Sequence, residues 1–304
     1  MPCGQEGPKR RSWRSRLFVE HSKPLERHSA RTRVITSLIG AKRGRTALRP
    51  KGVKNEDRRV FLMIDDQLYS SSDVNRDLDA QALAHHLLIE SIIAHGHAPR
   101  REKLAREMGL SLTEVEALYR RMAENHALVL HPHEPEPWII HPFSLSPTAT
   151  WVEHDGRGWW APCMWCAFGI LALATDNKGI VHTRLQGEAE ALDLRVDGDD
   201  IAPADLIIHF SIQPRHAWDN VHHTCATCLP FRSQAQIDQW SHKHDLSRGE
   251  GIPVRTLARF ARTWYGRHRD RHWQKWSVEQ AQAVFEQFGM VGPFWAIGVG
   301  ADRF

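Results

Sequence analysis

The sequence predicts an α+β fold, with an N-terminal winged helix-turn-helix-like domain followed by a mixed β-sheet domain with flanking helices. Two observations lead to this fold. Apolar residues recur with helical spacing between residues 79 and 127, and short extended runs separated by turn residues appear from Pro142 onward. The chain of 304 residues is 41% apolar and contains 12 Trp, so a substantial core is expected.

Three helices are predicted in the N-terminal part of the chain. They cover residues 79–95, 100–109 and 113–127. In the third helix, Val115, Leu118 and Met122 recur on one face, which predicts that this face is buried. Thr113 and Glu116 have the spacing of a capping box, which predicts the start of this helix.

Two short extended runs, ALVLH and PWIIH, follow the third helix and are joined by the turn-like PHEPE. Three helices and a two-stranded wing are typical of a winged helix domain, predicted here over residues 61–145. A helix that reads DNA needs positive charge toward the phosphates. Residues 113–126 carry Arg120 and Arg121 against three Glu, a net charge of −1. We therefore expect a structural role for this domain and no nucleic-acid partner.

Charge is concentrated at the start of the chain. Residues 1–60 hold 17 Lys and Arg against 5 Asp and Glu, a net +12, so with the whole chain at +4 the remainder carries about −8. This composition favours a disordered basic extension, or residues ahead of a start at Met63. A nucleic-acid-binding arm or a targeting segment is the alternative.

Residues 146–304 are predicted to form the second domain. A hairpin is expected around Asp155-Gly156, followed by a buried helix after Cys166. ALDLRV and LIIHFSI are expected to be strands on either side of an acidic turn. Three further helices are expected in SQAQIDQWSHKH, capped by Ser233, in PVRTLARFARTWYG and in SVEQAQAVFEQFG.

Four of the 5 cysteines form two Cys-x-x-Cys pairs. The pairs are Cys163 with Cys166 and Cys225 with Cys228, and the fifth cysteine, Cys3, lies in the basic segment. This spacing lets both sulfurs of a pair face one centre, and two pairs can converge on a single soft metal. The chain has no apolar run long enough to span a membrane and no signal-peptide pattern, so a cytoplasmic protein is expected. In that reducing compartment, such pairs are more often metal-binding or catalytic than disulfide-bonded.

Two tracts around these cysteines resemble the alkylmercury lyase (organomercurial lyase) family. They are HPFSLSPTATWVEHDGRGWWAPCMWCAFGI and TCATCLPFRS. The resemblance extends from about residue 79 to Trp240 and continues more weakly into TWYGRHRDRHW and EQAQAVFEQFGMVGPFW. It implies that Cys163 and Cys225 hold the two catalytic cysteine positions. It also implies an alkylmercury-lyase-like fold, a small organometallic substrate and no required cofactor.

The implied reaction is protonolysis of a carbon–mercury bond, giving a hydrocarbon and Hg(II). Thiolate sulfur is the preferred ligand of the very soft Hg(II), and a general acid must protonate the leaving carbon. The family has an Asp three residues after the first cysteine, where this chain has Cys166. Cys166 is therefore the candidate acid, beside Cys163 and Cys225. Cellular thiols or a mercuric reductase would accept the Hg(II).

The same residues are also consistent with a second function, metal binding without catalysis. If Cys163, Cys166, Cys225 and Cys228 face one another, they form a closed thiolate site for Zn, Cu or Hg in a metal-binding or sensing protein. For Cys166 and Cys228, simple packing is as consistent with the sequence as a ligand role.

Histidine and tryptophan side chains near the cysteines are further candidates. His222 and His223 precede Cys225 in a stretch expected to be extended, in which only one of them would point toward the thiols. Trp159, Trp160 and Trp165 are expected mainly in the core and could also wall an apolar pocket for an organic group.

Overall fold

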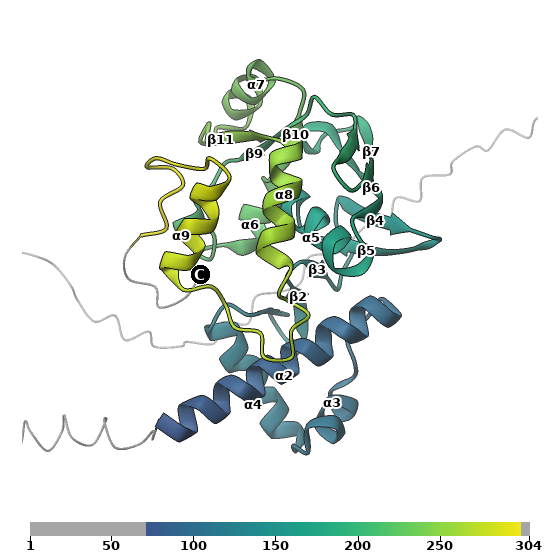
Figure 1. Ribbon diagram of the computed structural model, residues 1–304, viewed down its shortest axis with the longest axis vertical. Coiled ribbons are helices and arrows are strands. Elements are labelled where there is room, and N and C mark those ends of the chain that lie inside the picture. Colours follow the sequence, from purple (N-terminus) through teal and green to yellow (C-terminus); the bar gives the residue numbers. More distant parts are fainter. Residues whose placement is uncertain (1–70, 299–304) are drawn as a thin grey trace, which may run out of the picture. The chain divides into compact units, whose positions relative to one another are not determined.

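The computed structural model describes residues 71–298, with side chains from residue 74 onward. The predicted basic extension, residues 1–60, and Cys3 lie outside this range. The described chain combines helices with two antiparallel sheets, which confirms the α+β class (Figure 1). No helix within residues 71–298 is long and apolar enough to cross a membrane.

Three helices form the first part of the described chain. They are α2 (Ser71–His95), α3 (Arg101–Met108) and α4 (Leu112–Glu124). Leu88 and Ile92 of α2 are fully buried, as are Val115, Leu118 and Met122 of α4, so the predicted buried face of the third helix is confirmed.

The predicted capping box of α4 is wrong by two residues. The N-cap is Ser111, whose hydroxyl accepts a hydrogen bond from the Glu114 backbone, while the Glu114 carboxylate accepts one from the Ser111 backbone. Both Ser111-x-x-Glu114 and Thr113-x-x-Glu116 fit the sequence pattern. Glu116 instead forms an ion pair with Arg101 at the start of α3, so its carboxylate is engaged elsewhere.

The two strands predicted as a wing are β1 (Val129–Leu130) and β2 (Pro137–Ile140), which pair antiparallel. β2 also pairs with β3 (Phe143–Ser144), so these strands continue directly into the large sheet. A winged helix domain ending at residue 145 stays a prediction.

The large sheet has eight strands in the order β1-β2-β3-β5-β4-β6-β7-β8. Its remaining strands are β4 (Thr150–His154), β5 (Arg157–Ala161), β6 (Lys178–Arg184), β7 (Ala191–Asp197) and β8 (Asp200–Ala202). β4 and β5 form the predicted hairpin, with positive φ at both Asp155 and Gly156. Two positive-φ residues make the tight turn whose twist matches that of the strands, so this prediction is confirmed.

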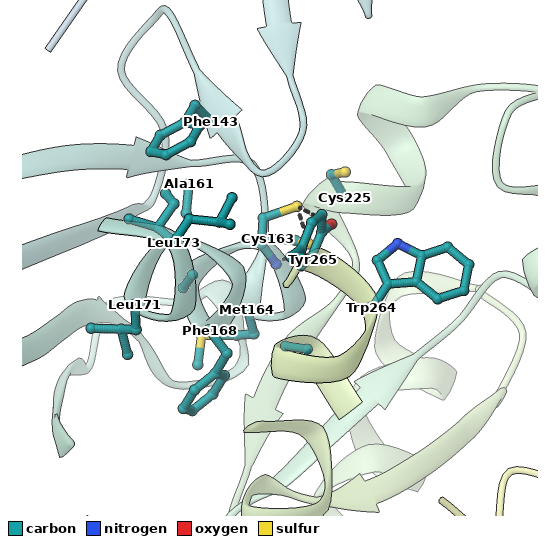
Figure 2. Close-up of a cluster of buried hydrophobic side chains, with 14 of the residues drawn as sticks. Phe143, Ala161, Cys163, Met164, Phe168, Leu171, Leu173, Cys225, Trp264 and Tyr265 are labelled. Carbon is teal, nitrogen blue, oxygen red and sulfur yellow. Dashed lines mark hydrogen bonds between the residues drawn. The ribbon is translucent and has the colours of Figure 1, made fainter. Parts of the chain in front are cut away.

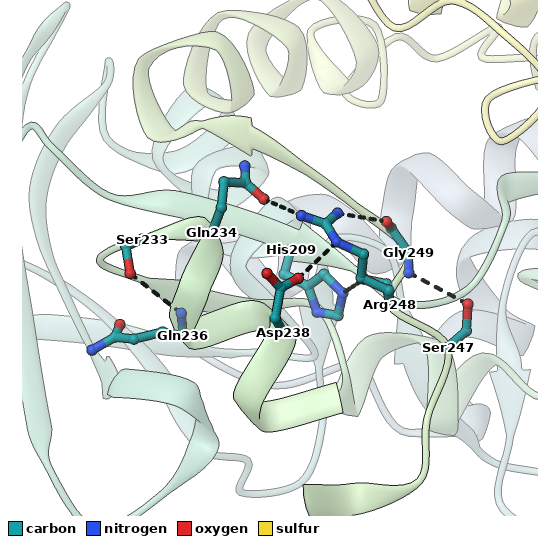
Figure 3. Close-up of polar contacts among 8 residues, drawn as sticks. All are labelled: His209, Ser233, Gln234, Gln236, Asp238, Ser247, Arg248 and Gly249. Atoms are coloured by element: carbon teal, nitrogen blue, oxygen red, sulfur yellow. Dashed lines mark hydrogen bonds and ion pairs between the residues drawn. The ribbon is translucent and has the colours of Figure 1, made fainter. Parts of the chain in front are cut away.

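A smaller sheet places β9 (Ile207–Phe210) between β10 (Leu229–Phe231) and β11 (Glu250–Pro253). Helix α7 (Gln234–His244) begins at the predicted cap, where the Ser233 hydroxyl accepts from the Gln236 backbone. Arg248 ties this helix to the sheet (Figure 3). Its guanidinium donates to Asp238 and Gln234 of α7, and its carbonyl accepts from Nε2 of the buried His209 at 2.6 Å.

The core helix is α5 (Met164–Ala174), which is apolar on every side and lies between the large sheet and α8 (Val254–Tyr265). Gly169 permits this packing, because a Cβ there would lie 2.3 Å from the Tyr265 ring. Helix α9 (Val278–Gln287) packs on α8. One continuous cluster of buried residues runs from α2 through α5 to Ile297, so all these elements share a core.

The cap of α4 gives a stability prediction. Replacing Ser111 by Ala removes the acceptor for the Glu114 backbone N–H, and we expect the free energy of unfolding to fall by about 1 kcal/mol. The matched control is Thr113→Ala, at an exposed position in the first turn that makes no cap. Urea unfolding of both variants checks this; equal losses would contradict the assigned cap.

Candidate functional site

A buried cavity of about 100 Å³ brings together all four cysteines of the Cys-x-x-Cys pairs. The thiols of Cys163, Cys166, Cys225 and Cys228 are free and buried, and each borders this cavity. The other lining residues come from α2, α5, α6, α8, α9 and the segments between them. Among the described residues, no Asp or Glu borders the cavity.

Cys163 occupies the N-cap of α5 (Figure 2). Its backbone is extended and its sulfur accepts a hydrogen bond from the Cys166 backbone N–H, with an N–S distance of 3.4 Å. The Cys166 thiol then lies one turn along the helix, and the two sulfurs are 3.3 Å apart. A helix start therefore fixes both sulfurs relative to each other.

Cys225 and Cys228 come from the other side of the cavity. Cys225 lies in helix α6 (Val221–Ala226), and the Cys228 backbone donates to the Cys225 carbonyl just after this helix. The prediction of an extended stretch here is wrong, because Asn220 caps a short helix by accepting from the His223 backbone. His222 is exposed to solvent, and its ring makes a T-shaped contact with the Trp138 ring. Neither His222 nor His223 lines the cavity.

His141, which the sequence analysis did not single out, contacts the thiols directly. Its Nδ1 lies 3.4 Å from the Cys166 sulfur. One ligand atom from each of His141, Cys166 and Cys225 lies within 4.8 Å of the others. Two sulfurs and one imidazole nitrogen at this spacing suit a soft or borderline metal. The only sequence signal that could have pointed to His141 is its position at the start of the tract HPFSLSPTAT.

Tyr265 is a second neighbour that the sequence analysis missed. Its hydroxyl lies 3.5 Å from the Cys166 sulfur, at the end of α8 (Figure 2). Contact with His141, Tyr265 and Cys163 gives Cys166 polar partners on several sides within an otherwise apolar environment. The Cys166–Tyr265 contact joins residues 99 positions apart, which no local pattern could predict.

The four thiols differ in their readiness to ionise. Burial favours a neutral Cys163, but hydrogen bonds from Cys166, Cys225 and Cys228 to its sulfur hold its pKa well below the ordinary value. Burial raises the pKa of Cys166 and of Cys228, and donation to Cys163 raises both further. The same donation is the main cause of the raised pKa of Cys225. Among the four thiols, only Cys163 has a lowered pKa, and the pKa of each of the other three is raised.

The two nearest non-cysteine groups are neutral. Burial lowers the pKa of His141 to about 4, although the negative charge at Cys163 works in the opposite direction. Burial likewise raises the pKa of the Tyr265 hydroxyl well above its usual value. Both groups can therefore donate a hydrogen bond to a sulfur without bringing a positive charge.

Aromatic rings make up much of the cavity wall. They belong to Trp165, Phe210, Trp218, Trp264, Tyr265, Trp273, Trp276 and Phe285. Of the three tryptophans named from the sequence, only Trp165 lines the cavity. For Trp159 and Trp160 the pocket role is wrong: Trp159 donates to the Ile92 carbonyl, and Trp160 packs against Trp151.

A pair of buried histidines completes the wall away from the thiols. His85 stacks on Trp273 at a ring distance of 3.8 Å, and His268 lies 4.9 Å from both the Trp273 and Tyr265 rings. Burial lowers the pKa of both histidines, to about 3 for His85, so both are neutral. Their Nδ1 atoms have no hydrogen-bond partner among the described residues.

Comparison with known families matches residues 143–266 to the alkylmercury lyase (MerB) family. The resemblance to alkylmercury lyases is confirmed over this segment. The alkylmercury lyase segment contains all four cavity cysteines and Tyr265, whereas His141 lies just before it and Trp273 to Phe285 lie after it. The helices α2 to α4, where the sequence also suggested the family, lie outside the match.

A solved structure supports the same fold. The crystal structure of the mercury-bound form of MerB2 matches with a TM-score of 0.51 and 16% sequence identity, covering 72% of this chain and 100% of that chain. At this identity the likeness concerns the fold. No curated protein matches the chain.

The unequal thiols give a labelling prediction. Thiolates react with iodoacetamide and thiols do not. Cys163 should therefore alkylate even below the usual pH range for cysteine, while Cys166, Cys225 and Cys228 stay unreactive throughout. Peptide mass spectrometry after brief labelling between pH 6 and 9 measures this. A profile in which all four residues lose reactivity together would contradict the assignment.

Proposed function

We propose that this chain cleaves carbon–mercury bonds by protonolysis, with Cys163 and Cys225 binding the metal and Cys166 donating the proton. The observation that carries this proposal is the convergence of four buried thiols on one aromatic-walled cavity without a carboxylate among its described lining residues. The match of residues 143–266 to the alkylmercury lyase family supports the reaction type.

Metal capture begins at Cys163 in this proposal. Its sulfur is held as a thiolate at the start of α5 and displaces the ligand that accompanies R–Hg⁺ into the cavity. Cys225 then gives up its proton to the displaced ligand, and its sulfur binds mercury as the second thiolate, from α6. Two thiolate ligands raise the electron density on mercury and weaken its bond to carbon.

The proton for carbon then comes from Cys166. Burial holds the pKa of its thiol above the ordinary value, its sulfur lies 3.3 Å from the Cys163 sulfur, and no carboxylate among the described residues lines the cavity beside it. Transfer of this proton to carbon releases R–H and leaves a thiolate at Cys166 beside Hg(II). Tyr265 and a His141 tautomer with hydrogen on Nδ1 would both donate to that thiolate. These hydrogen bonds would stabilise the product of the transfer.

The organic group would lie against the aromatic wall. Trp165 lines the cavity from the first turn of α5, between Cys163 and Cys166 in the sequence. Trp264 lines it from the end of α8, next to Tyr265 (Figure 2). The cavity of about 100 Å³ is smaller than the roughly 150 Å³ apolar cavity known to hold benzene. Small alkyl groups would therefore fit without movement, and a phenyl group would require side chains to shift.

Release of Hg(II) needs an outside acceptor. After protonolysis, the thiolates of Cys163, Cys166 and Cys225 can all bind the Hg(II) ion. An incoming thiol must therefore replace each of these sulfurs before the ion can leave. Cellular thiols or a mercuric reductase would take the ion by stepwise ligand exchange.

The test is hydrocarbon release from phenylmercury and methylmercury in excess thiol, measured by gas chromatography. Cys163→Ser should abolish the release above the thiol-only background. Cys166→Ser should lower it by about 10²-fold or more, because a hydroxyl is a much weaker acid than a thiol. Cys166→Asp restores the acid of the family pattern and should retain activity.

Controls separate chemistry from folding. Cys3→Ser removes the one cysteine outside the two pairs and should leave the rate unchanged. Circular dichroism shows whether each variant is folded. No hydrocarbon from the folded wild-type protein would end the lyase proposal, and full activity in Cys166→Ser would end the role of Cys166 as the acid.

A non-catalytic metal-binding protein is the second candidate function. The observation that favours it is the His141, Cys166 and Cys225 group, whose ligand atoms lie within 4.8 Å of one another. With Cys163 and Cys228 on the same cavity, this donor set fits Zn, Cu(I) or Hg(II).

Metal content of the purified protein distinguishes the two candidates. A metal-binding protein should carry close to one metal per chain and lose it in Cys166→Ser/Cys228→Ser. Elemental analysis together with a thiol count measures this. Metal-free protein with every thiol titratable would exclude a resident metal and leave the lyase proposal standing.

A further inference from the structure

The first Cys-x-x-Cys pair has a geometry that neither mercury binding nor proton donation requires. Cys163 and Cys166 lie within one helical turn, on the same helix start, with their sulfurs in contact at 3.3 Å. A disulfide needs a separation of about 2.05 Å, so closure requires an approach of roughly 1.2 Å. Side-chain rotation can supply such a movement while the backbone of α5 keeps its place.

The two sulfurs are also unequally accessible. Cys163 is 5% exposed and Cys166 is 1% exposed, and both border the cavity. A molecule entering the cavity therefore meets the Cys163 sulfur more readily. The Cys166 backbone N–H and the helix start favour negative charge on that sulfur. An attacking sulfur that borders the cavity, with a second and less accessible sulfur one turn away, is the arrangement that thiol–disulfide exchange needs.

We propose that Cys163 and Cys166 also act as a redox-active dithiol that reduces small uncharged disulfides and closes into an intramolecular disulfide. The cavity defines the class of disulfide, because its wall is aromatic and its volume of about 100 Å³ excludes large molecules. The exchange does not depend on the proposed lyase activity.

The exchange proceeds in two balanced steps. The Cys163 thiolate attacks one sulfur of R′S–SR′, the S–S bond breaks and R′S⁻ leaves. The Cys166 thiol then loses its proton and its sulfur attacks the Cys163 sulfur, releasing the second R′S⁻. The Cys163 thiolate and the Cys166 thiol are oxidised to one disulfide, and the small disulfide is reduced to one thiolate and one thiol, which takes the proton from Cys166.

Closure has a consequence for mercury that rests on the proposed function. The disulfide removes the capturing thiolate and the proton donor together, whereas Cys225 and Cys228 stay reduced. Oxidation would therefore switch off carbon–mercury cleavage, and a dithiol reductant would restore it. The cysteine that stands where the family has an acid would make this chain sensitive to disulfides in a way that an aspartate could not.

The experiment uses the full chain carrying Cys3→Ser, so that only the four cavity thiols are counted. Reduced protein, free of reductant, is incubated with 2-hydroxyethyl disulfide, quenched with N-ethylmaleimide and mapped by mass spectrometry. We expect the loss of two free thiols, release of two molecules of 2-mercaptoethanol, and a peptide containing Cys163 and Cys166 joined. Cys166→Ser should stop after the first step, with a stable mixed disulfide on Cys163.

The remaining outcomes decide against the proposal. In Cys163→Ser no mixed disulfide should form on Cys166, and its appearance would reverse the assigned order. Four unreacted thiols in the folded Cys3→Ser protein, or a disulfide that includes Cys225 or Cys228, would overturn the dithiol. No mercury enters this assay, so its failure leaves the lyase proposal intact, and a protein that exchanges disulfides without releasing hydrocarbon contradicts only the proposed lyase.

Discussion

The hydrogen bond from the Cys166 backbone to the Cys163 sulfur determines much of this structure. It satisfies one backbone donor at the start of α5, as a serine or aspartate cap would, but with a sulfur that borders a cavity. Because α5 is apolar on all sides and buried between the large sheet and α8, its start has little freedom to move. The position of the reactive sulfur is therefore set by the packing of an entire helix.

That packing also brings the other partners of Cys166 into place. Gly169 lets α8 approach α5 so closely that Tyr265 reaches the Cys166 sulfur from the end of its helix. His141 arrives just before β3, at the edge where the strands of the large sheet meet α5. Aromatic rings of α8 and α9 line the same cavity, so this polar cluster lies against a mostly apolar wall. Polar contacts gain strength in such low-dielectric surroundings.

The turns, helix caps and apolar helices of this chain could be predicted from its sequence because residues close in the sequence determine them. The Asp155-Gly156 turn, the Ser233 cap and the apolar helix after Cys166 each follow from a few neighbouring residues. The start of α4 was misplaced because two overlapping Ser/Thr-x-x-Glu patterns compete, and a distant ion pair from Arg101 engages Glu116. Helix α6 was missed because its six residues are too few to show a period. His141 and Tyr265 were missed because both meet Cys166 only through tertiary packing, and only the place of His141 at the head of HPFSLSPTAT pointed to either of them.

The cysteine at position 166 carries the largest functional consequence. A carboxylic acid at this place can give a proton and bind a metal weakly, whereas a thiol can give a proton, bind mercury strongly and be oxidised. These roles exclude one another at any moment, because each uses the same sulfur and its single proton. The neighbours at 3.3 to 3.5 Å bear on each of these roles. In the proposed reactions, Cys163 is placed for disulfide closure, while His141 and Tyr265 are placed to stabilise the thiolate that would follow proton transfer. Hydrogen bonds from neutral donors weaken the hold of a thiolate on a metal, since they draw on the same sulfur lone pairs. On the proposed function, these contacts would keep Cys166 a proton donor and prevent it from becoming a permanent ligand, as turnover in a four-thiol cavity would require.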